Sequence, residues 1–247
     1  LDVFGLAAAS GTGTLRINQL ASAVSETVSI FGSPVAISVP GGPYLRVDTT
    51  GTTLTILGSA VTGDFSYEQK TTLDGSEVVS VAVANASVSL KEGGITLLQL
   101  TGGSGYFIFS DDGMAGTAIG TVTQFMSFIS GLTAGGTFSL AINTTDDAVS
   151  ESYTLNGSTV VIDAPEGPYL KIAADDVSFT LNPGGGLNSL VVSGDFGFEQ
   201  KTTGASLDYI KAGATNVHLS LTALGISVLA LNGTGAFIFN SLGMAGE

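Results

Sequence analysis

One acidic motif that occurs twice holds the residues whose types and spacing come closest to a reactive or metal-binding pattern. It reads GDFSYEQKTT at 63–72 and GDFGFEQKTT at 194–203, with eight identities in ten positions. Each copy supplies two carboxylates four residues apart, Asp64 with Glu68 and Asp195 with Glu199. Such a pair could serve acid–base chemistry or offer oxygen ligands to Ca²⁺. These four residues are therefore the candidate calcium ligands.

The same motif also has a structural interpretation, which the residue pattern favours. Alternation along an extended strand puts Glu68 and Lys70 on one face and Phe65 on the other. Glu68 would then pair with Lys70, and Glu199 with Lys201, along a sheet surface, while the aromatic side chains face the core. Charged pairs more often stabilise a surface than form a reactive site. No catalytic residue is predicted, and the protein is expected not to be an enzyme.

Other polar residues form weaker patterns. Three further acidic pairs lie in predicted turns and do not recur in the other copy: Asp111–Asp112, Asp146–Asp147 and Asp175–Asp176. The chain lacks the loop of an EF-hand and the glycine-rich nonapeptides of a calcium roll. His218, the one histidine, is predicted on the polar side of a strand, without the partners of a catalytic triad. Calcium is the one cofactor left open.

Four asparagines begin an N-x-S/T triplet, the acceptor for N-glycosylation in secreted eukaryotic proteins. They are Asn85, Asn143, Asn156 and Asn232. Such triplets also arise by chance in a chain this rich in serine and threonine, so the pattern leaves glycosylation open.

Composition excludes several classes of protein. The 247 residues include 21 acidic and seven basic ones, and a net charge of −14 repels phosphate backbones, so no nucleic-acid partner is expected. Without cysteine there are no disulfides and no thiolate metal sites. No apolar run approaches the ~18 residues of a membrane-spanning helix. The first residues lack a basic signal-peptide segment, and the chain is expected to be an excerpt or a processed piece.

The hydrophobic pattern predicts strands almost throughout. Apolar and hydroxylic residues alternate in 177–181 and 217–221, and Phe138, Leu140 and Ile142 form a third such stripe. One face of each strand should be buried, with a Ser/Thr face toward water. Turn residues recur about every eight to twelve positions, the spacing of antiparallel hairpins in a sandwich, barrel or rolled sheet.

The duplication extends well beyond the acidic motif. PGGPYLR (40–46) matches PEGPYLK (165–171), and GYFIFSDDGMAG (105–116) matches GAFIFNSLGMAG (235–246). Phe31-Gly32 corresponds to Asn156-Gly157, which predicts a tight hairpin with positive φ in each copy. Residues predicted to fill the core are Tyr44, Tyr169, Phe107, Phe237, Phe109 and Phe239.

The repeat predicts an elongated all-β protein of two homologous tandem modules, 1–120 and 121–247. Each module would consist of antiparallel hairpins packed as a sandwich or as a rolled, solenoid-like sheet. The segment 117–130 between them is apolar and partly alternating. We therefore expect a continuous sheet or a tight interface there, and not a flexible linker.

Four motifs together resemble a known group of proteins. GTFSLAINTT (136–145), the GPYL corners, GDFxxEQ and the GMAG endings cover most of both copies. They resemble the tandem β-repeat modules of very large secreted or surface proteins of bacteria, the giant adhesin-like proteins associated with RTX, Calx-β and cadherin-like segments. The resemblance implies an extracellular or cell-surface location and an array-forming role. It implies no catalytic or binding residue.

Three functions follow as hypotheses. The first is an extracellular structural repeat, a stalk or fibre element whose partner is another copy of itself, associating end to end through open strand edges. The alternative is a calcium- or carbohydrate-dependent adhesion module, with a glycan as partner. The third is an outer-membrane barrel, which the small Ser/Thr residues and the duplication disfavour.

Overall fold

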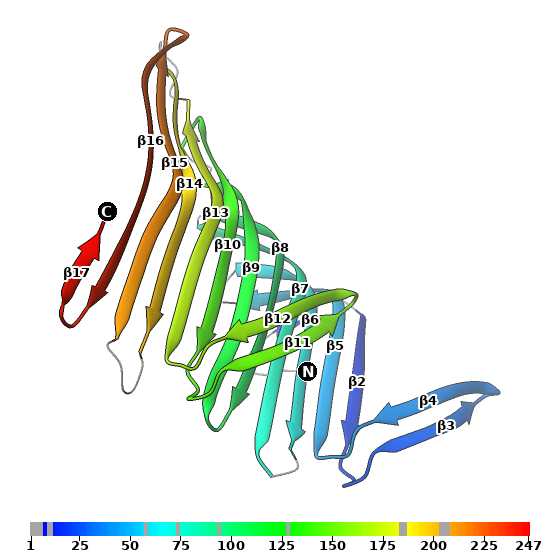
Figure 1. Cartoon of the computed structure of the whole chain (residues 1–247). Helices are drawn as coiled ribbons and strands as arrows, with labels where there is room; N and C mark the ends of the chain where they lie inside the picture. The colour runs from blue at the N-terminus through cyan, green and yellow to red at the C-terminus, as the bar shows by residue number, and fades with distance from the viewer. Residues whose placement is uncertain are drawn as a thin grey trace.

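The computed structural model describes residues 7–8, 12–56, 59–72, 75–92, 95–126, 129–182, 187–202 and 208–247. The chain is all-β and antiparallel, as predicted, and these residues contain no helix (Figure 1). Accordingly, nothing in the described ranges is a helix long and apolar enough to cross a membrane.

The strands follow one another with short turns between most of them. In chain order they are β1 (Ala7–Ala8), β2 (Thr12–Asn18), β3 (Val24–Ile30), β4 (Ser33–Val39), β5 (Tyr44–Ile56), β6 (Ser59–Thr71), β7 (Glu77–Glu92), β8 (Ile95–Ser110), β9 (Gly113–Phe125), β10 (Leu132–Asn143), β11 (Val149–Leu155), β12 (Ser158–Ala164), β13 (Tyr169–Leu181), β14 (Leu187–Lys201), β15 (Tyr209–Ala223), β16 (Ile226–Asn240) and β17 (Gly243–Gly246).

Thirteen of these strands form one large sheet. Its order is β1-β5-β6-β7-β8-β9-β10-β13-β14-β15-β16-β17, and β2 also pairs with β5. The first copy of the sequence repeat supplies β2 to β9, and the second supplies the same series as β10 to β17. Strands β9 and β10 pair through eight Cα partners, from Gly136↔Val122 to Asn143↔Ala115. The sheet therefore runs without a break from one copy into the other, and residue 120 lies inside β9.

Two hairpins leave the sheet at the same point of each copy. Flap 1 consists of β3 and β4, and flap 2 consists of β11 and β12. Both tips have positive φ at two successive residues, 48° and 85° at Phe31-Gly32 and 48° and 83° at Asn156-Gly157, so the predicted tight hairpins are confirmed. Flap 2 lies across the strands of the first copy, whereas flap 1 projects away beyond β2 (Figure 1).

One buried asparagine holds the root of each flap. Asn143 Nδ2 donates to Asp147 O (2.7 Å) and Pro165 O (2.8 Å), which lie at the two ends of flap 2. Its Oδ1 accepts from the backbone N of Thr145 (2.9 Å). Asn18 makes the same contacts at flap 1, donating to Ser22 O and Pro40 O. The asparagine therefore joins the end of a sheet strand to both strands of its flap.

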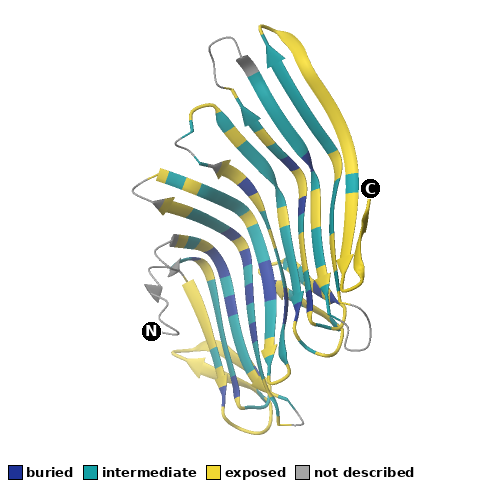
Figure 2. Cartoon of the chain, turned by 90° about the vertical axis from the view of Figure 1, so that its left-hand side faces the viewer, coloured by how far each residue is buried: buried dark blue, intermediate teal, exposed yellow. Residues whose placement is uncertain are grey.

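A line of β-bulges crosses the sheet at mid-length. Pairing shifts between Thr49 and Thr52, Thr62 and Asp64, Val83 and Ala86 in the first copy, and at the equivalent places in the second. Bulges bend and twist the strands that carry them, and the strands bend at this level in Figures 1 and 2. The pair Asp175–Asp176 belongs to this line. Its prediction as a turn is wrong, because it is an irregularity inside β13.

Only part of the predicted core is buried. Tyr44 and Tyr169 are buried, as predicted, beside the flap roots. Phe109, Phe237 and Phe239 are instead 39%, 46% and 39% exposed, and that part of the prediction is wrong. By alternation these phenylalanines lie on the face opposite the flaps, because the flap-facing residue in β8 is Tyr106. The described residues place no second layer over that opposite face.

Candidate functional site

A hydrophobic core cluster lies at the interface between flap 2 and the sheet of the first copy. Flap 2 contributes Leu155, Ile162 and Ala164, which are 5%, 0% and 2% exposed. The sheet contributes small side chains, Ala82 and Ala84, which let the hairpin lie close to the strands. A segment of the second copy therefore completes the core of the first.

Tyr153 of β11 is the central side chain of this interface. Its ring stacks on Tyr106 of β8, with 4.9 Å between the centroids, and Arg46 Cζ lies 5.2 Å from the centre of the same ring. Its hydroxyl lies 2.6 Å from Ser66 Oγ. Because Ser66 gives its own hydrogen to Asp48 (2.6 Å), Tyr153 is the donor. Burial raises the pKa of Tyr153, which keeps the hydroxyl protonated.

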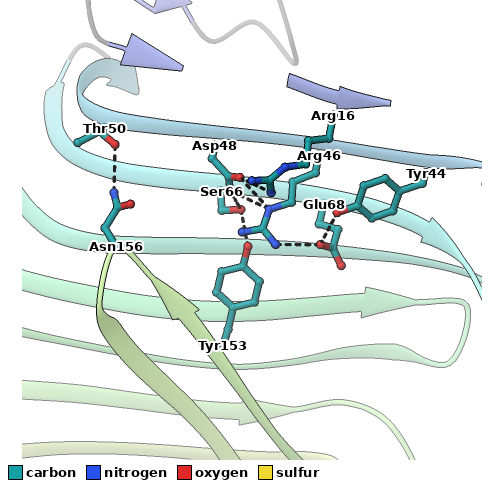
Figure 3. A network of polar contacts seen from close by, with 9 residues as sticks. All are labelled: Arg16, Tyr44, Arg46, Asp48, Thr50, Ser66, Glu68, Tyr153 and Asn156. Atoms are coloured by element: carbon teal, nitrogen blue, oxygen red, sulfur yellow. Dashed lines mark hydrogen bonds and ion pairs between the residues drawn. The ribbon is translucent and has the colours of Figure 1, made fainter. Parts of the chain in front are cut away.

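A network of charged groups surrounds Tyr153 (Figure 3). Arg46 Nε bonds Asp48 at 2.9 Å, and its Nη1 bonds Glu68 Oε2 at 3.3 Å. Arg16 Nη1 lies 3.2 Å from Asp48, and Tyr44 OH donates to Glu68 at 3.1 Å. Both arginines of the chain are thus in one network of linked ion pairs, which orients Arg46 against the Tyr153 ring.

The candidate ligand Asp64 lies beside a bulge, to which its side chain is hydrogen-bonded. Its carboxylate accepts from the backbone N of Gly51 (2.9 Å) and from Asn85 Nδ2 (2.8 Å), two positive-φ residues of the adjacent bulges. The Asn85 side chain, followed by the Gly51 amide, lowers the pKa of Asp64. Asp64 therefore connects three strands across the bend of the sheet.

Asp195 makes the equivalent contacts in the second copy. It accepts from the backbone N of Asp176 (2.8 Å) and from Asn216 Nδ2 (2.6 Å), and the first of these bonds is the main cause of its lowered pKa. In both copies the Asp of the repeated GDF motif thus lies at the line of bulges. There its carboxylate can accept hydrogen bonds from the irregular strands on both sides.

The glutamates of the motif differ between the copies. Lys70 Nζ lies 3.9 Å from Glu68, in agreement with the predicted pair. The prediction that Glu199 pairs with Lys201 is wrong, because Lys201 reaches Glu166 (3.3 Å) and Glu199 bonds Lys211 (3.2 Å) on the neighbouring strand. Burial raises the pKa of Glu199, but the donors Tyr209 and Lys211 outweigh it and lower the pKa overall.

The structure does not join the candidate calcium ligands into one site. In the ranges that the structure describes, no three histidine, aspartate or glutamate side chains gather as a metal would require. Asp64 faces the bulge donors, whereas Glu68 faces Arg46 and Tyr44. Each carboxylate already accepts hydrogen bonds from protein donors, which leaves the arrangement suited to holding strands together.

The remaining polar candidates also have structural partners. His218 Nδ1 lies 2.8 Å from Asn232 Oδ1 on the paired strand. Asn143 is 0% exposed and holds the flap root, so in the folded protein its amide is inaccessible to a glycan-transferring enzyme. Asn85 donates to Asp64, and Asn156 donates to Thr50 Oγ1 (3.1 Å) from the tip of flap 2.

Sequence reasoning did not identify Arg46, Asp48 and Tyr153 as partners. Tyr153 and Arg46 are 107 positions apart, and nothing in the local pattern connects them. One signal was present: the PYL corner is followed by a basic residue in both copies, Arg46 and Lys171. Comparison of the chain with protein-family models, with curated proteins and with solved structures gives no match.

Proposed function

We propose that the chain is a structural repeat that adds further copies of itself edge to edge, as an element of an extracellular stalk or fibre at a bacterial surface. The observation that carries this proposal is the pairing of β9 with β10, by which one copy of the repeat extends the sheet of the other. The same two surfaces recur at the outer edges of the sheet, on β17 and β2.

The two outer edges correspond to the strands that pair at the internal junction. Ile17 of β2 matches Ile142 of β10, 125 residues later, and Met244 of β17 matches Met114 of β9, 130 residues earlier. Ile17 is 57% exposed and Met244 is 66% exposed, whereas Ile142 and Met114 are half-buried. In the described part of the chain no strand pairs with the outer side of β2 or β17. Figure 2 displays this exposure at both ends of the sheet.

Among the residues that the structure describes, neither edge carries the usual protection against strand addition. Edge strands are commonly protected by lysine, by proline or by a covering segment. Strand β2 reads TGTLRIN and β17 reads GMAG. Together the two strands contain one charged side chain and no proline. Unpaired backbone groups on a strand of this kind pair readily with another strand.

The internal junction also supplies a register for the addition. Asn143 lies opposite Ala115 and Ile142 opposite Gly116. The corresponding pairs between copies are Asn18 with Ala245 and Ile17 with Gly246. The extracellular and bacterial parts of the proposal rest on the resemblance of the repeat motifs to giant surface proteins.

Sedimentation of the wild-type chain across a wide range of concentration tests the proposal. We expect association, and uniform filaments in electron micrographs of concentrated samples. Leu15→Lys with Ile17→Lys places two charges on the β2 edge and should raise the concentration needed by about tenfold or more, which corresponds to ~1.4 kcal/mol. The matched control is Thr27→Lys with Ser29→Lys, which adds the same charge on flap 1 away from that edge.

Two results would contradict the proposal. One is a wild-type chain that stays monomeric at every concentration. The other is an edge variant that associates as readily as its control, with circular dichroism confirming that both retain the strands.

A further inference from the structure

In the described part of the chain, flap 1 presents an apolar face that is largely exposed. Val28, Ile30, Val35 and Ile37 are 45%, 49%, 45% and 41% exposed. Alternation and the pairs Val28↔Val35 and Glu26↔Ile37 put these four side chains on one face of the hairpin. Their counterparts in flap 2, 125 residues later, face the sheet, and Leu155 and Ile162 are almost completely buried. Flap 1 thus has the side chains of a docked flap, and no described strand of the sheet lies under it as the first-copy strands lie under flap 2.

The second copy has the converse surface, since no flap among the described residues lies over its sheet face. At the place corresponding to the Tyr106–Tyr153 stack lies an open hollow of about 630 Å³. Gly197, Gly213 and Ala236 line it, where the first copy has Ser66, Ala82 and Tyr106. Strand β16, which borders it, is exposed along almost its whole length.

We propose that flap 1 of one copy docks into this hollow on the second-repeat sheet of another copy of the chain. This docking rests on the proposed edge addition, which brings the two surfaces together. Within the chain, flap 2 follows β10 and lies across β9 and the strands that come before β9 (Figure 1). A copy whose β2 pairs with β17 would direct flap 1 over β14 to β16 in the same way.

The two surfaces differ from the internal interface in the same direction, toward smaller side chains. Flap 1 has Val28 where flap 2 has Tyr153, and the hollow has Ala236 where the first copy has Tyr106. Both partners of the aromatic stack are replaced by small apolar residues. The internal interface therefore combines two large rings, and the proposed one combines aliphatic side chains with a floor of glycine and alanine.

Both surfaces also carry charged side chains. Glu26, the one charged residue of flap 1, lies on the same face as Val28. Burial and, to a smaller extent, the charge of its counterpart Glu151 raise the pKa of Tyr106, and Ser80 lowers it, so both lie near that ring. Lys211 occupies the position of Ser80 in the second copy, and it lines the hollow together with Lys171. The hollow is also lined by Glu199, which bonds Lys211 at 3.2 Å, and by Glu247, so a docked flap 1 would bring Glu26 to a surface with charges of both signs.

Cross-linking of cysteine variants tests the docking, because the natural chain has no cysteine. A Val28→Cys molecule is mixed with an Ala236→Cys molecule and treated with a short bis-maleimide. Covalent dimers are expected, since the internal counterparts of these positions are stacked rings 4.9 Å apart. Thr27→Cys, on the outer face of the same strand, is the matched control and should give several-fold less dimer with Ala236→Cys.

The outcomes separate this inference from the proposed function. If sedimentation reports association but Val28→Cys gives no more dimer than Thr27→Cys, flap docking is overturned and edge addition stands. Monomers at every concentration overturn both. As a second measurement, Ile37→Asp puts a charge on the docking face and should weaken association several-fold; unchanged association in this folded variant would also overturn the docking.

Discussion

The flap root allows one prediction to be worked through in detail. Asn143→Ala removes two hydrogen bonds to the carbonyls of Asp147 and Pro165 and one from the Thr145 amide, all at a side chain that is 0% exposed. A buried polar group left without its partner costs about 1–3 kcal/mol, and partial access of water to the flap root reduces the sum. We expect a loss of about 3–4 kcal/mol in the free energy of unfolding. For a chain of this size that corresponds to a Tm lower by roughly 6–16 °C.

Urea or thermal unfolding followed by circular dichroism measures this loss. Asn18→Ala is the matched control, because it removes equivalent bonds to Ser22, Pro40 and Leu20 at the root of flap 1. Flap 1 buries little against its own chain, so its local opening limits the cost, and we expect less than half the effect. Equal destabilisation by the two variants, or a loss under about 1 kcal/mol for Asn143→Ala, would refute the reasoning.

Three shorter predictions test other parts of the structure. Tyr153→Phe should lose about 1 kcal/mol, for one hydrogen bond, and Tyr153→Ala about 2–4 kcal/mol in urea unfolding; equal losses would mean that the ring does not anchor flap 2. The pKa of Asp64 is lowered by folding, so its contribution to stability is present above its ordinary value of 3.8 and is lost as pH falls through the folded pKa. Asp64→Asn should therefore be less stable than wild type at neutral pH and should approach it in acid, and a pH-independent difference would contradict this. Adding or chelating Ca²⁺ should leave Tm unchanged, because the oxygens of Asp64 and Glu68 accept from protein donors; a saturating rise in Tm would instead favour the adhesion alternative.

Flap docking and edge pairing would act together in an assembly. Edge pairing supplies backbone hydrogen bonds with little preference for particular side chains, whereas flap docking depends on matching shapes. Because the internal flap differs from flap 1 at Tyr153 and Val28, the two docking surfaces are not interchangeable. This difference would favour docking of flap 1 on the second-repeat sheet of another copy over its replacing flap 2 on the first-repeat sheet.

Local pattern predicted much of the fold. Alternation identified the strands, and the Gly32 and Gly157 hairpins are found where expected because a positive φ at a tight turn is a local requirement. The pair Asp175–Asp176 was mistaken for a turn because a bulge and a turn use the same residue types. The exposed phenylalanines were mistaken for core because alternation indicates which residues share a face, and not whether another layer covers that face.

The candidate site was predictable in part. The repeated GDF and EQK residues do have recurring or related roles, since Asp64 and Asp195 both accept hydrogen bonds at bulges. Their partners come from other strands, and so does the partner of Glu199, which is Lys211 and not the nearer Lys201. A pairing across strands depends on register, which a single strand's sequence does not contain.

The sequence by itself determined the all-β class, the alternation of faces and the duplication, because backbone preferences and side-chain periodicity act over a few residues. The tertiary structure alone decided that flap 2 crosses onto the sheet of the first copy, that Tyr153 meets Arg46 and Tyr106, and that no described segment covers flap 1 or the second-repeat face. These arrangements arise from packing between distant segments, since Tyr153 is 47 positions from Tyr106 and 107 from Arg46, and apolar area and shape select the contact.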